Sequence, residues 1–245
     1  MIHFISDLHL SSQTPGIARR FLHYLENEAR QATQLFVLGD LFEAWPGDDC
    51  IDDPDDNLAS EIVSALRRLA DSGVSVSIMH GNRDFMLGDA FAARCGARLL
   101  PDPFLLSLPS REFVLSHGDA LCTDDLEYQA FRAKVRAPAF RAAAMTRPLA
   151  ERKATAAALR QQSEQSKETK NKTGQYSLDL NPGAIETFLR DNRLATFIHG
   201  HTHQPAVHAH LIDGVRVERW VLADWSDARG EYLSFDGQAL CRHPL

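Results

Sequence analysis

Carboxylate, amide and imidazole side chains recur along this chain, each directly after a short apolar run. The set comprises Asp7 and His9 in SDLHL, Asp40 in LGDLFE, Asn82 in GNRD, His117 in SHGD, and His199 and His201 in HGHTH. Seven such oxygen and nitrogen donors suit two divalent cations if one carboxylate bridges them and water fills the open positions. The set therefore predicts a dinuclear metal site. Asp40 is the predicted bridge, because it follows the second strand, near the centre of the expected sheet.

Each motif also has an ordinary structural interpretation. An aspartate after a strand can cap a turn, an asparagine after glycine is common in turns, and the histidines of HGHTH can lie on the surface. A shared site explains the order D-x-H, G-D, G-N, H-G-D and H-G-H better than five unrelated turns do. Neighbouring glycines such as Gly39 and Gly200 suit the close backbone approach that such a site needs.

The apolar runs predict buried strands that alternate with amphipathic helices. The runs are IHFIS, QLFVLGD, VSVSIMHGN, EFVLSHGD and ATFIHGH. Apolar residues at helical spacing predict one helix over 15–25, after Pro15, and another over 58–69, closed by Gly73. Further strands are expected in GVRVERWVLADW and EYLSFDGQALCRH, the latter a hairpin turning at 236–237. This alternation of strands and helices predicts an α/β fold.

Residues 126–190 break this pattern and predict an inserted helical cap. The core is then formed by residues 1–125 and 191–245, and the insertion, rich in Ala, Arg, Lys and Gln, is expected to form two or three helices. Residues 130–172 hold eleven Lys and Arg against three Glu, although the whole chain has a net charge of −7. A basic block in an acidic protein indicates an anionic partner; the alternative is a solvated helix face.

Composition is ordinary for a globular protein, with 44% hydrophobic and 24% charged residues. The four cysteines are widely spaced and predict reduced thiols of a cytoplasmic protein, since neither a disulfide framework nor a zinc motif is evident. We expect no export signal and no bilayer-spanning run. The protein is expected to be soluble, or at most attached to a membrane surface.

The order of the motifs resembles that of the calcineurin-like metallophosphoesterase superfamily, over the chain outside the insertion. This resemblance implies a β-sandwich of two mixed sheets flanked by helices, with the metal site at one end. It also implies two ligand sets that share Asp40. Mapped onto this sequence, the first set is Asp7, His9, Asp40 and His201, and the second is Asp40, Asn82, His117 and His199.

The motif GNRD departs from the commoner G-N-H-[DE] of this superfamily, because Arg83 takes the place of a histidine that helps the leaving group. Arginine stays protonated and binds phosphate as a planar fork, so it is a poor proton donor. A phosphate leaving group needs little protonation. The substitution therefore favours cleavage of a pyrophosphate over that of a simple monoester.

Four longer stretches, GDLFEAWPGDD, HGNRDFMLG, HGDALCTDDLEYQAFR and HGHTHQPAVH, are similar to those of the bacterial UDP-2,3-diacylglucosamine pyrophosphatase family. This resemblance implies hydrolysis of UDP-2,3-diacylglucosamine to UMP and 2,3-diacylglucosamine 1-phosphate, a step of lipid A biosynthesis. It implies two Mn²⁺ ions and a peripheral position on the cytoplasmic face of the inner membrane. Water activated by the two ions would attack the phosphorus attached to uridine.

The same resemblance assigns roles to individual residues. Those expected in catalysis are Asp40, Asn82, Arg83, His117 and His199, with Arg83 and His199 offsetting charge on the departing lipid phosphate. Those expected to contact the substrate are Asn82, Arg83, Asp125, Tyr128, Ser166, Lys170, Thr173 and His199. The stretch SKETKNKTG departs from the commoner pattern, so Lys172 is an alternative to Thr173. Asp125 as a helix N-terminal acid and Tyr128 as a core aromatic are the structural alternatives.

Three other functions remain as alternatives. A soluble nucleotide phosphodiesterase of the same fold would share every ligand but would need no acyl chains. A catalytically silent scaffold should have lost ligands, and no member of the set is missing. Nucleic-acid binding is not expected, because the basic block has only Phe131 and Phe140 as aromatic residues and the net charge is negative. We expect a monomer.

Overall fold

A computed structural model describes residues 1–172 and 179–245 and contains two β-sheets. The first has the order β11 (Leu240–Pro244), β10 (Glu231–Phe235), β1 (Ile2–Ile5), β2 (Gln34–Leu38), β3 (Ser75–Met79) and β4 (Ala97–Leu100). The second has the order β5 (Phe104–Ser107), β6 (Glu112–Ser116), β7 (Thr196–His199), β9 (Val215–Val221) and β8 (Ala206–Ile212). Both are mixed, because β1 to β4 run parallel, as do β6, β7 and β9, while the edge hairpins are antiparallel.

An apolar layer lies between the two sheets. Phe4 and Phe36 of the first sheet stack with ring centroids 5.4 Å apart, and Phe113 of the second meets Phe235 edge-on at 4.9 Å. All four rings are at most 2% exposed, so their burial contributes on the order of 2 kcal/mol each. The predicted β-sandwich is confirmed.

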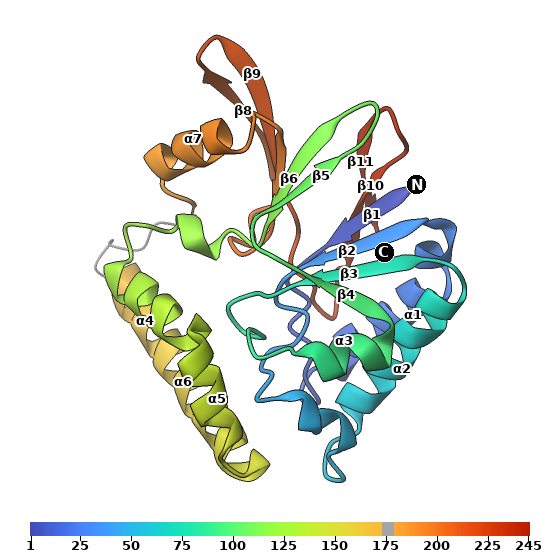
Figure 1. The fold of residues 1–245 in the computed structure, drawn as a ribbon, viewed down its shortest axis with the longest axis vertical. Coiled ribbons are helices and arrows are strands. Elements are labelled where there is room, and N and C mark those ends of the chain that lie inside the picture. The colour runs from blue at the N-terminus through green and yellow to red at the C-terminus, as the bar shows by residue number, and fades with distance from the viewer. Residues whose placement is uncertain (173–178) are drawn as a thin grey trace.

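Helices cover both outer faces of the sandwich. Helices α1 (Pro15–Glu26), α2 (Leu58–Asp71) and α3 (Asp89–Cys95) pack on the first sheet, as the apolar spacing of the first two predicted. Helix α7 (Pro182–Asp191) packs on the second sheet through Ile185 and Leu189, beside Phe197 of β7 (Figure 1). The hairpin β10–β11 turns at residues 236–239, as expected. Strands β4, β5 and β8 were not predicted.

The insertion forms a cap of three helices beside the sandwich, α4 (Leu126–Arg136), α5 (Pro138–Met145) and α6 (Leu149–Lys172) (Figure 1). Because α7 packs into the core, the predicted cap boundary at residue 190 falls near the end of a core helix rather than before it. Within the two described ranges, no helix is both long and apolar enough to span a bilayer.

The positive charge of the cap is turned largely toward the core. Arginines of α4 donate to Asp119, Arg141 of α5 donates to the carbonyl of Leu87, and α6 pairs with three core carboxylates. The α6 pairs are Arg152 with Asp49, Lys153 with Asp53, and Arg160 with Glu43. Core carboxylates therefore neutralise part of the charge for which an anionic partner was predicted.

Candidate active site

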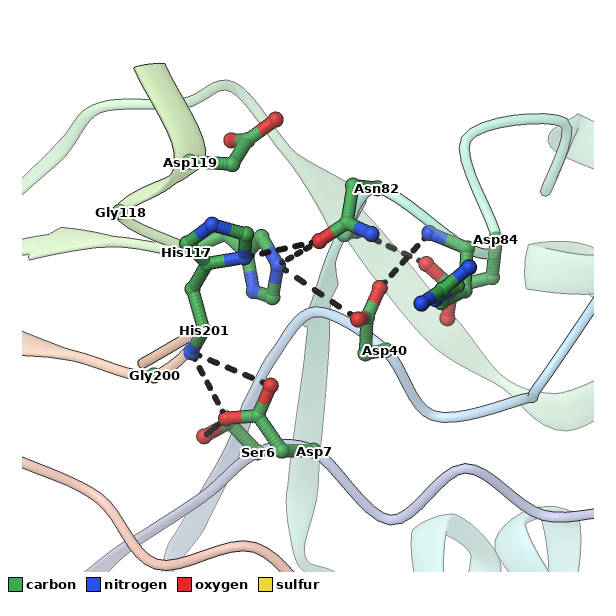
Figure 2. A network of polar contacts seen from close by, with 12 residues as sticks. Ser6, Asp7, Asp40, Asn82, Asp84, His117, Gly118, Asp119, Gly200 and His201 are labelled. Carbon is green, nitrogen blue, oxygen red and sulfur yellow. Dashed lines mark hydrogen bonds and ion pairs between the residues drawn. The ribbon is translucent and has the colours of Figure 1, made fainter. Parts of the chain in front are cut away.

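Loops that follow the parallel strands converge at one end of the sandwich and bring together a cluster of polar side chains (Figure 2). We call it the donor cluster; its members are Asp7, His9, Asp40, Asn82, His117, His201 and His203. The carboxyl ends of adjacent parallel strands share one edge of a sheet, and this topology assembles the cluster from five separate segments. Six of the seven residues were predicted from the sequence, and His203 was not.

The backbone at these positions is held in an uncommon conformation. Five residues of the donor cluster have positive φ: Asp7 (55°), His9 (51°), Asp40 (52°), His201 (71°) and His203 (56°). Residues other than glycine rarely adopt such angles, and they persist where the surrounding structure fixes them, often at functional sites. Hydrogen bonds from Asp7 N to Gly39 O (3.1 Å) and from His9 N to Asp40 O (3.0 Å) tie the first two loops together.

One part of the cluster surrounds the Nε2 atom of His9. This atom lies 3.2 Å from His203 Nε2, 4.0 Å from Asp7 Oδ1 and 3.8 Å from Asp40 Oδ2. His203 Nε2 in turn lies 3.4 Å from Asp7 Oδ1. Two imidazole nitrogens and two carboxylates that face one point form a donor set suited to a divalent cation.

A second part surrounds the Oδ1 atom of Asn82. His117 Nε2 lies 3.0 Å from this oxygen and His201 Nδ1 lies 2.9 Å from it, as Figure 2 shows. Asp40 Oδ2 lies 3.7 Å from His117 Nε2, so Asp40 is near both parts of the cluster. Asp40 is thus a carboxylate that lies between the two parts of the cluster.

His199 lies outside the donor cluster, contrary to its predicted roles as ligand and catalytic residue. It is the last residue of β7 and faces the same side as Phe197, with the two rings 4.6 Å apart. Its Nε2 lies 3.2 Å from Arg219 Nη1, and Arg219 pairs with Asp179. Alternate residues of a strand share a face, and the face of Phe197 packs on α7, so His199 cannot join the loops at the strand end.

His201 and His203 supply the two imidazoles that follow β7. His201 belongs to the Asn82 part rather than to the His9 part predicted for it, and His203 takes the place beside His9. The motif HGHTH contains three histidines, and β7 ends at the first of them, His199. The other two lie in the loop after the strand, and the other candidate ligands likewise lie in loops after strands. Gly200 is needed here, because a Cβ atom would lie 2.2 Å from Asp7 Oδ2.

Charges of opposite sign are concentrated in this buried space. Burial alone would raise the pKa of Asp7, but the neighbouring imidazoles outweigh it and hold that pKa well below its ordinary value. Burial opposes the charge on His117, yet the carboxylates of Asp40 and Asp7 raise its pKa to about 9. Burial and the charge of His117 lower the pKa of His201 to about 4. When no cation is bound, a proton on His117 therefore balances part of the negative charge of Asp40 and Asp7.

These contacts fit divalent cations. The Nε2 atoms of His9 and His203 lie close together, and ring nitrogens of His117 and His201 converge on the amide oxygen of Asn82. Imidazole nitrogens, carboxylates and an amide oxygen are the atoms that bind such cations in proteins. Buried carboxylates are rarely gathered without cations to neutralise them. Asp7, His9, Asp40 and His203 could hold one ion, and Asp40, Asn82, His117 and His201 a second.

Two buried aspartates support the loops of the cluster. Asp84 accepts hydrogen bonds from the backbone of Leu41 and Gly81, both at 2.8 Å, and so joins the loop after β2 to the loop after β3. Burial and the charge of Asp40 raise the pKa of Asp84 to about 6. Sequence reasoning quoted GNRD but gave Asp84 no role. The aspartate at the last position of GNRD is the residue from which this role could have been predicted.

The second aspartate, Asp119, attaches the cap beside the cluster. It accepts from Tyr128 Oη at 2.5 Å, from Arg132 Nε at 2.8 Å and from Arg136 Nη2 at 3.5 Å. Arg136 also donates to the carbonyl of Gly81 at 3.0 Å, next to Asn82. Helix α4 is therefore fixed directly to two loops of the donor cluster.

A cavity of about 1220 Å³ separates the donor cluster from the cap. Apolar side chains from both parts line it, namely Trp45, Phe85, Met86, Phe131, Phe140 and Leu159. Four arginines, Arg83, Arg147, Arg152 and Arg160, also line it. The cavity opens onto Asp40, Asn82 and the histidines at positions 9, 201 and 203. An apolar slot with cationic groups suits a ligand with both a hydrophobic part and phosphates.

The predicted substrate contacts have different outcomes. Asn82, Arg83, Asp125 and Tyr128 all line the cavity. Asp125 also caps α4 by accepting from the backbone N of Tyr128 at 3.1 Å, which is the structural alternative expected for it. For Ser166, Lys170 and Lys172 only the helical backbone is described, and Thr173 lies outside the described residues.

Comparisons with known proteins agree with this architecture. A family profile described as calcineurin-like phosphoesterase matches residues 1–205. A UDP-2,3-diacylglucosamine hydrolase from Aromatoleum aromaticum is 50% identical over 234 residues, 96% of this chain and 92% of that protein. Another from Chromobacterium violaceum is 44% identical over 100% of this chain and 98% of its own. Among solved structures, Yfce, a phosphoesterase from E. coli, is 15% identical over 99% of this chain and 97% of its own, with a TM-score of 0.44.

Proposed function

This chain belongs to the calcineurin-like phosphoesterase family, and on that premise we propose that it hydrolyses the pyrophosphate bond of UDP-2,3-diacylglucosamine, a step of lipid A biosynthesis. The products are UMP and 2,3-diacylglucosamine 1-phosphate. The observation that carries the proposal is the cavity of about 1220 Å³, which joins the donor cluster to an apolar surface of the cap. Relatives that align over nearly the whole chain carry the name UDP-2,3-diacylglucosamine hydrolase.

Two divalent cations complete the proposed site. One would be held by Asp7, His9, Asp40 and His203, and the other by Asp40, Asn82, His117 and His201. When bound, such ions neutralise phosphoryl charge and make water more acidic, so that no protein base is required. Mn²⁺ is proposed as the ion on the resemblance of the motifs, since mixed Asp, Asn and His ligation also suits other metals.

The residues around the donor cluster bind and orient the pyrophosphate. Arg83 lies next to Asn82 on the cavity wall, and its backbone N donates to Asp40 Oδ1 at 2.8 Å, so its side chain begins at the metal site. A guanidinium there can clamp the lipid phosphate as it leaves. The apolar wall formed by Phe85, Met86 and Phe131 would receive acyl chains and exclude water.

We further propose that the protein works as a monomer on the cytoplasmic face of the inner membrane. Leu126 lines the cavity and is 77% exposed, and Met145 of the same cap is 46% exposed. An exposed apolar side chain on the cavity wall, together with a second one on the same cap, suits contact with lipid. Flotation with vesicles of anionic lipid and sizing of the free protein test these two points.

The proposed function is tested by comparing two substrates. Metal-stripped protein is assayed for UMP release from UDP-2,3-diacylglucosamine and from UDP-glucosamine without acyl chains, with and without Mn²⁺. Release from the acylated substrate alone, dependent on Mn²⁺, supports the proposal. Equal cleavage of both substrates would instead favour a soluble nucleotide phosphodiesterase, which the names of the relatives do not favour.

A further inference from the structure

Glu43 lies between the donor cluster and the cap and contacts both. Its Oε2 atom is 3.0 Å from Nδ1 of His9, and its Oε1 atom forms an ion pair with Nε of Arg160 on α6. The side chain of Glu43 is 24% exposed and that of His9 is 17% exposed, so water screens this contact only in part. No motif in the sequence analysis assigned a role to Glu43.

The backbone fixes Glu43 against the loop that carries His9. Leu10 N donates to Leu41 O at 3.0 Å, and Glu43 N donates to Leu10 O at 3.1 Å. Between them, Leu41 and Phe42 are buried in the core, at 0% and 3% exposure. The backbone of Glu43 is therefore held beside the loop of His9 by core packing and main-chain hydrogen bonds, and its carboxylate is placed by its contacts with His9 and Arg160.

This contact decides which nitrogen of His9 is available as a ligand. A carboxylate beside Nδ1 favours the tautomer in which Nδ1–H donates a hydrogen bond to it, and this tautomer leaves the lone pair on Nε2. Nε2 is the atom that faces His203, Asp7 and Asp40. Carboxylates that accept from a metal-binding histidine orient its ring and raise its basicity.

We propose that Glu43 is a positioning residue of the metal centre, which fixes the tautomer and ring orientation of His9 and links this ligand to cap helix α6 through Arg160. The inference rests on the proposed function, because it takes His9 as a ligand. Through its two oxygens, one carboxylate couples metal binding to the position of a helix that lines the substrate cavity.

The test measures binding of Mn²⁺ alone, by calorimetric titration of metal-stripped protein without substrate. Glu43→Leu removes the acceptor and is expected to weaken binding of one ion by about 10- to 100-fold. Glu43→Gln keeps an acceptor oxygen without the charge and should recover part of that loss. Lys153→Gln, which breaks the ion pair of α6 with Asp53 away from the ligands, is the matched control and should bind as wild type.

Two further variants separate the possible outcomes. Arg160→Gln breaks the link between Glu43 and the cap but keeps Glu43 beside His9, so Mn²⁺ affinity should stay within about threefold of wild type while the KM for the acylated substrate rises. An Arg160→Gln loss as large as that of Glu43→Leu would overturn the inference, because Glu43 would then act through the cap alone. Unchanged affinity of Glu43→Leu, alongside a loss in His9→Ala, would overturn the inference and leave the proposed function intact. Unchanged affinity of His9→Ala would overturn both.

Discussion

The assignment of His203 in place of His199 can be tested by a pair of substitutions. His203 Nε2 lies 3.2 Å from His9 Nε2 and 3.4 Å from Asp7 Oδ1, so His203→Ala removes one of four donors around a single position. Loss of a partner that only orients a ligand typically costs 10- to 100-fold in metal affinity, so loss of the ligand itself should cost about 100-fold or more. That corresponds to about 2.7 kcal/mol of binding free energy.

His199→Gln is the matched variant, in the same HGHTH motif. His199 is fully buried, and its Nε2 contacts Arg219 at 3.2 Å. Losing this contact and the packing of the ring on Phe197 should lower the free energy of unfolding by about 1–3 kcal/mol, while Arg219 keeps its ion pair with Asp179. Mn²⁺ affinity should stay within about threefold of wild type, because His199 is not among the donors.

The assay is a calorimetric titration of both metal-stripped variants with Mn²⁺, together with urea unfolding. The account expects metal loss in His203→Ala and a stability loss in His199→Gln. A folded His199→Gln variant that loses an ion, beside a His203→Ala variant that binds as wild type, would refute this reasoning and restore the ligand set predicted from the sequence.

Three other perturbations probe different parts of the structure. Asp119→Ala leaves the guanidinium of Arg132 without its buried partner and should lower the unfolding free energy by about 3–5 kcal/mol in urea titrations; a change below about 1 kcal/mol would show that α4 is not anchored there. Burial lowers the pKa of His3 to about 4, so the unfolded chain binds the extra proton and stability should fall as pH drops from 6.5 toward 4, by up to about 2 kcal/mol after solvent screening. His3→Gln should flatten that profile, and an unchanged slope would contradict the assignment. Ala156→Trp narrows the cavity and should raise KM for the acylated substrate about tenfold, whereas Ala157→Trp, outside the cavity lining, should not; equal effects would place the acyl slot elsewhere.

Strand ends could be predicted because their signal is local. The runs before Asp7, Asp40 and His117 are apolar and β-branched, and in parallel strands such runs must end at a shared edge. The shared edge was enough to predict that six residues of the donor cluster lie close together, although the sequence contains no distances. The ordered set of motifs, rather than any single residue, therefore predicted the site.

The prediction at HGHTH failed because sequence spacing does not say where a strand ends. β7 continues through His199, and its period of two directs that side chain toward Phe197 and α7. Only the residues after Gly200 leave the sheet and turn back to Asp7, whose carboxylate accepts from the backbone N of His201. A boundary shift of a few residues therefore exchanged one candidate ligand for another.

Other errors have similarly physical causes. Strand β8 was missed because its polarity is inverted: Val207 and Leu211 are exposed at 48% and 78%, while His208 and His210 are half-buried. Helix α7 was placed in the cap because composition cannot show which surface an amphipathic helix covers; Ile185 and Leu189 pack on the second sheet. Part of the charge of the basic block is likewise neutralised within the chain, as in the pair of Arg152 with Asp49.

The most direct test of the account is UMP release from UDP-2,3-diacylglucosamine by metal-stripped protein during stepwise addition of Mn²⁺. The donor cluster, with Asp40 shared between two sets of ligands, predicts no release in chelator and full activity once about two ions per chain are bound. Full activity in chelator, or no UMP after both ions have bound, would contradict it.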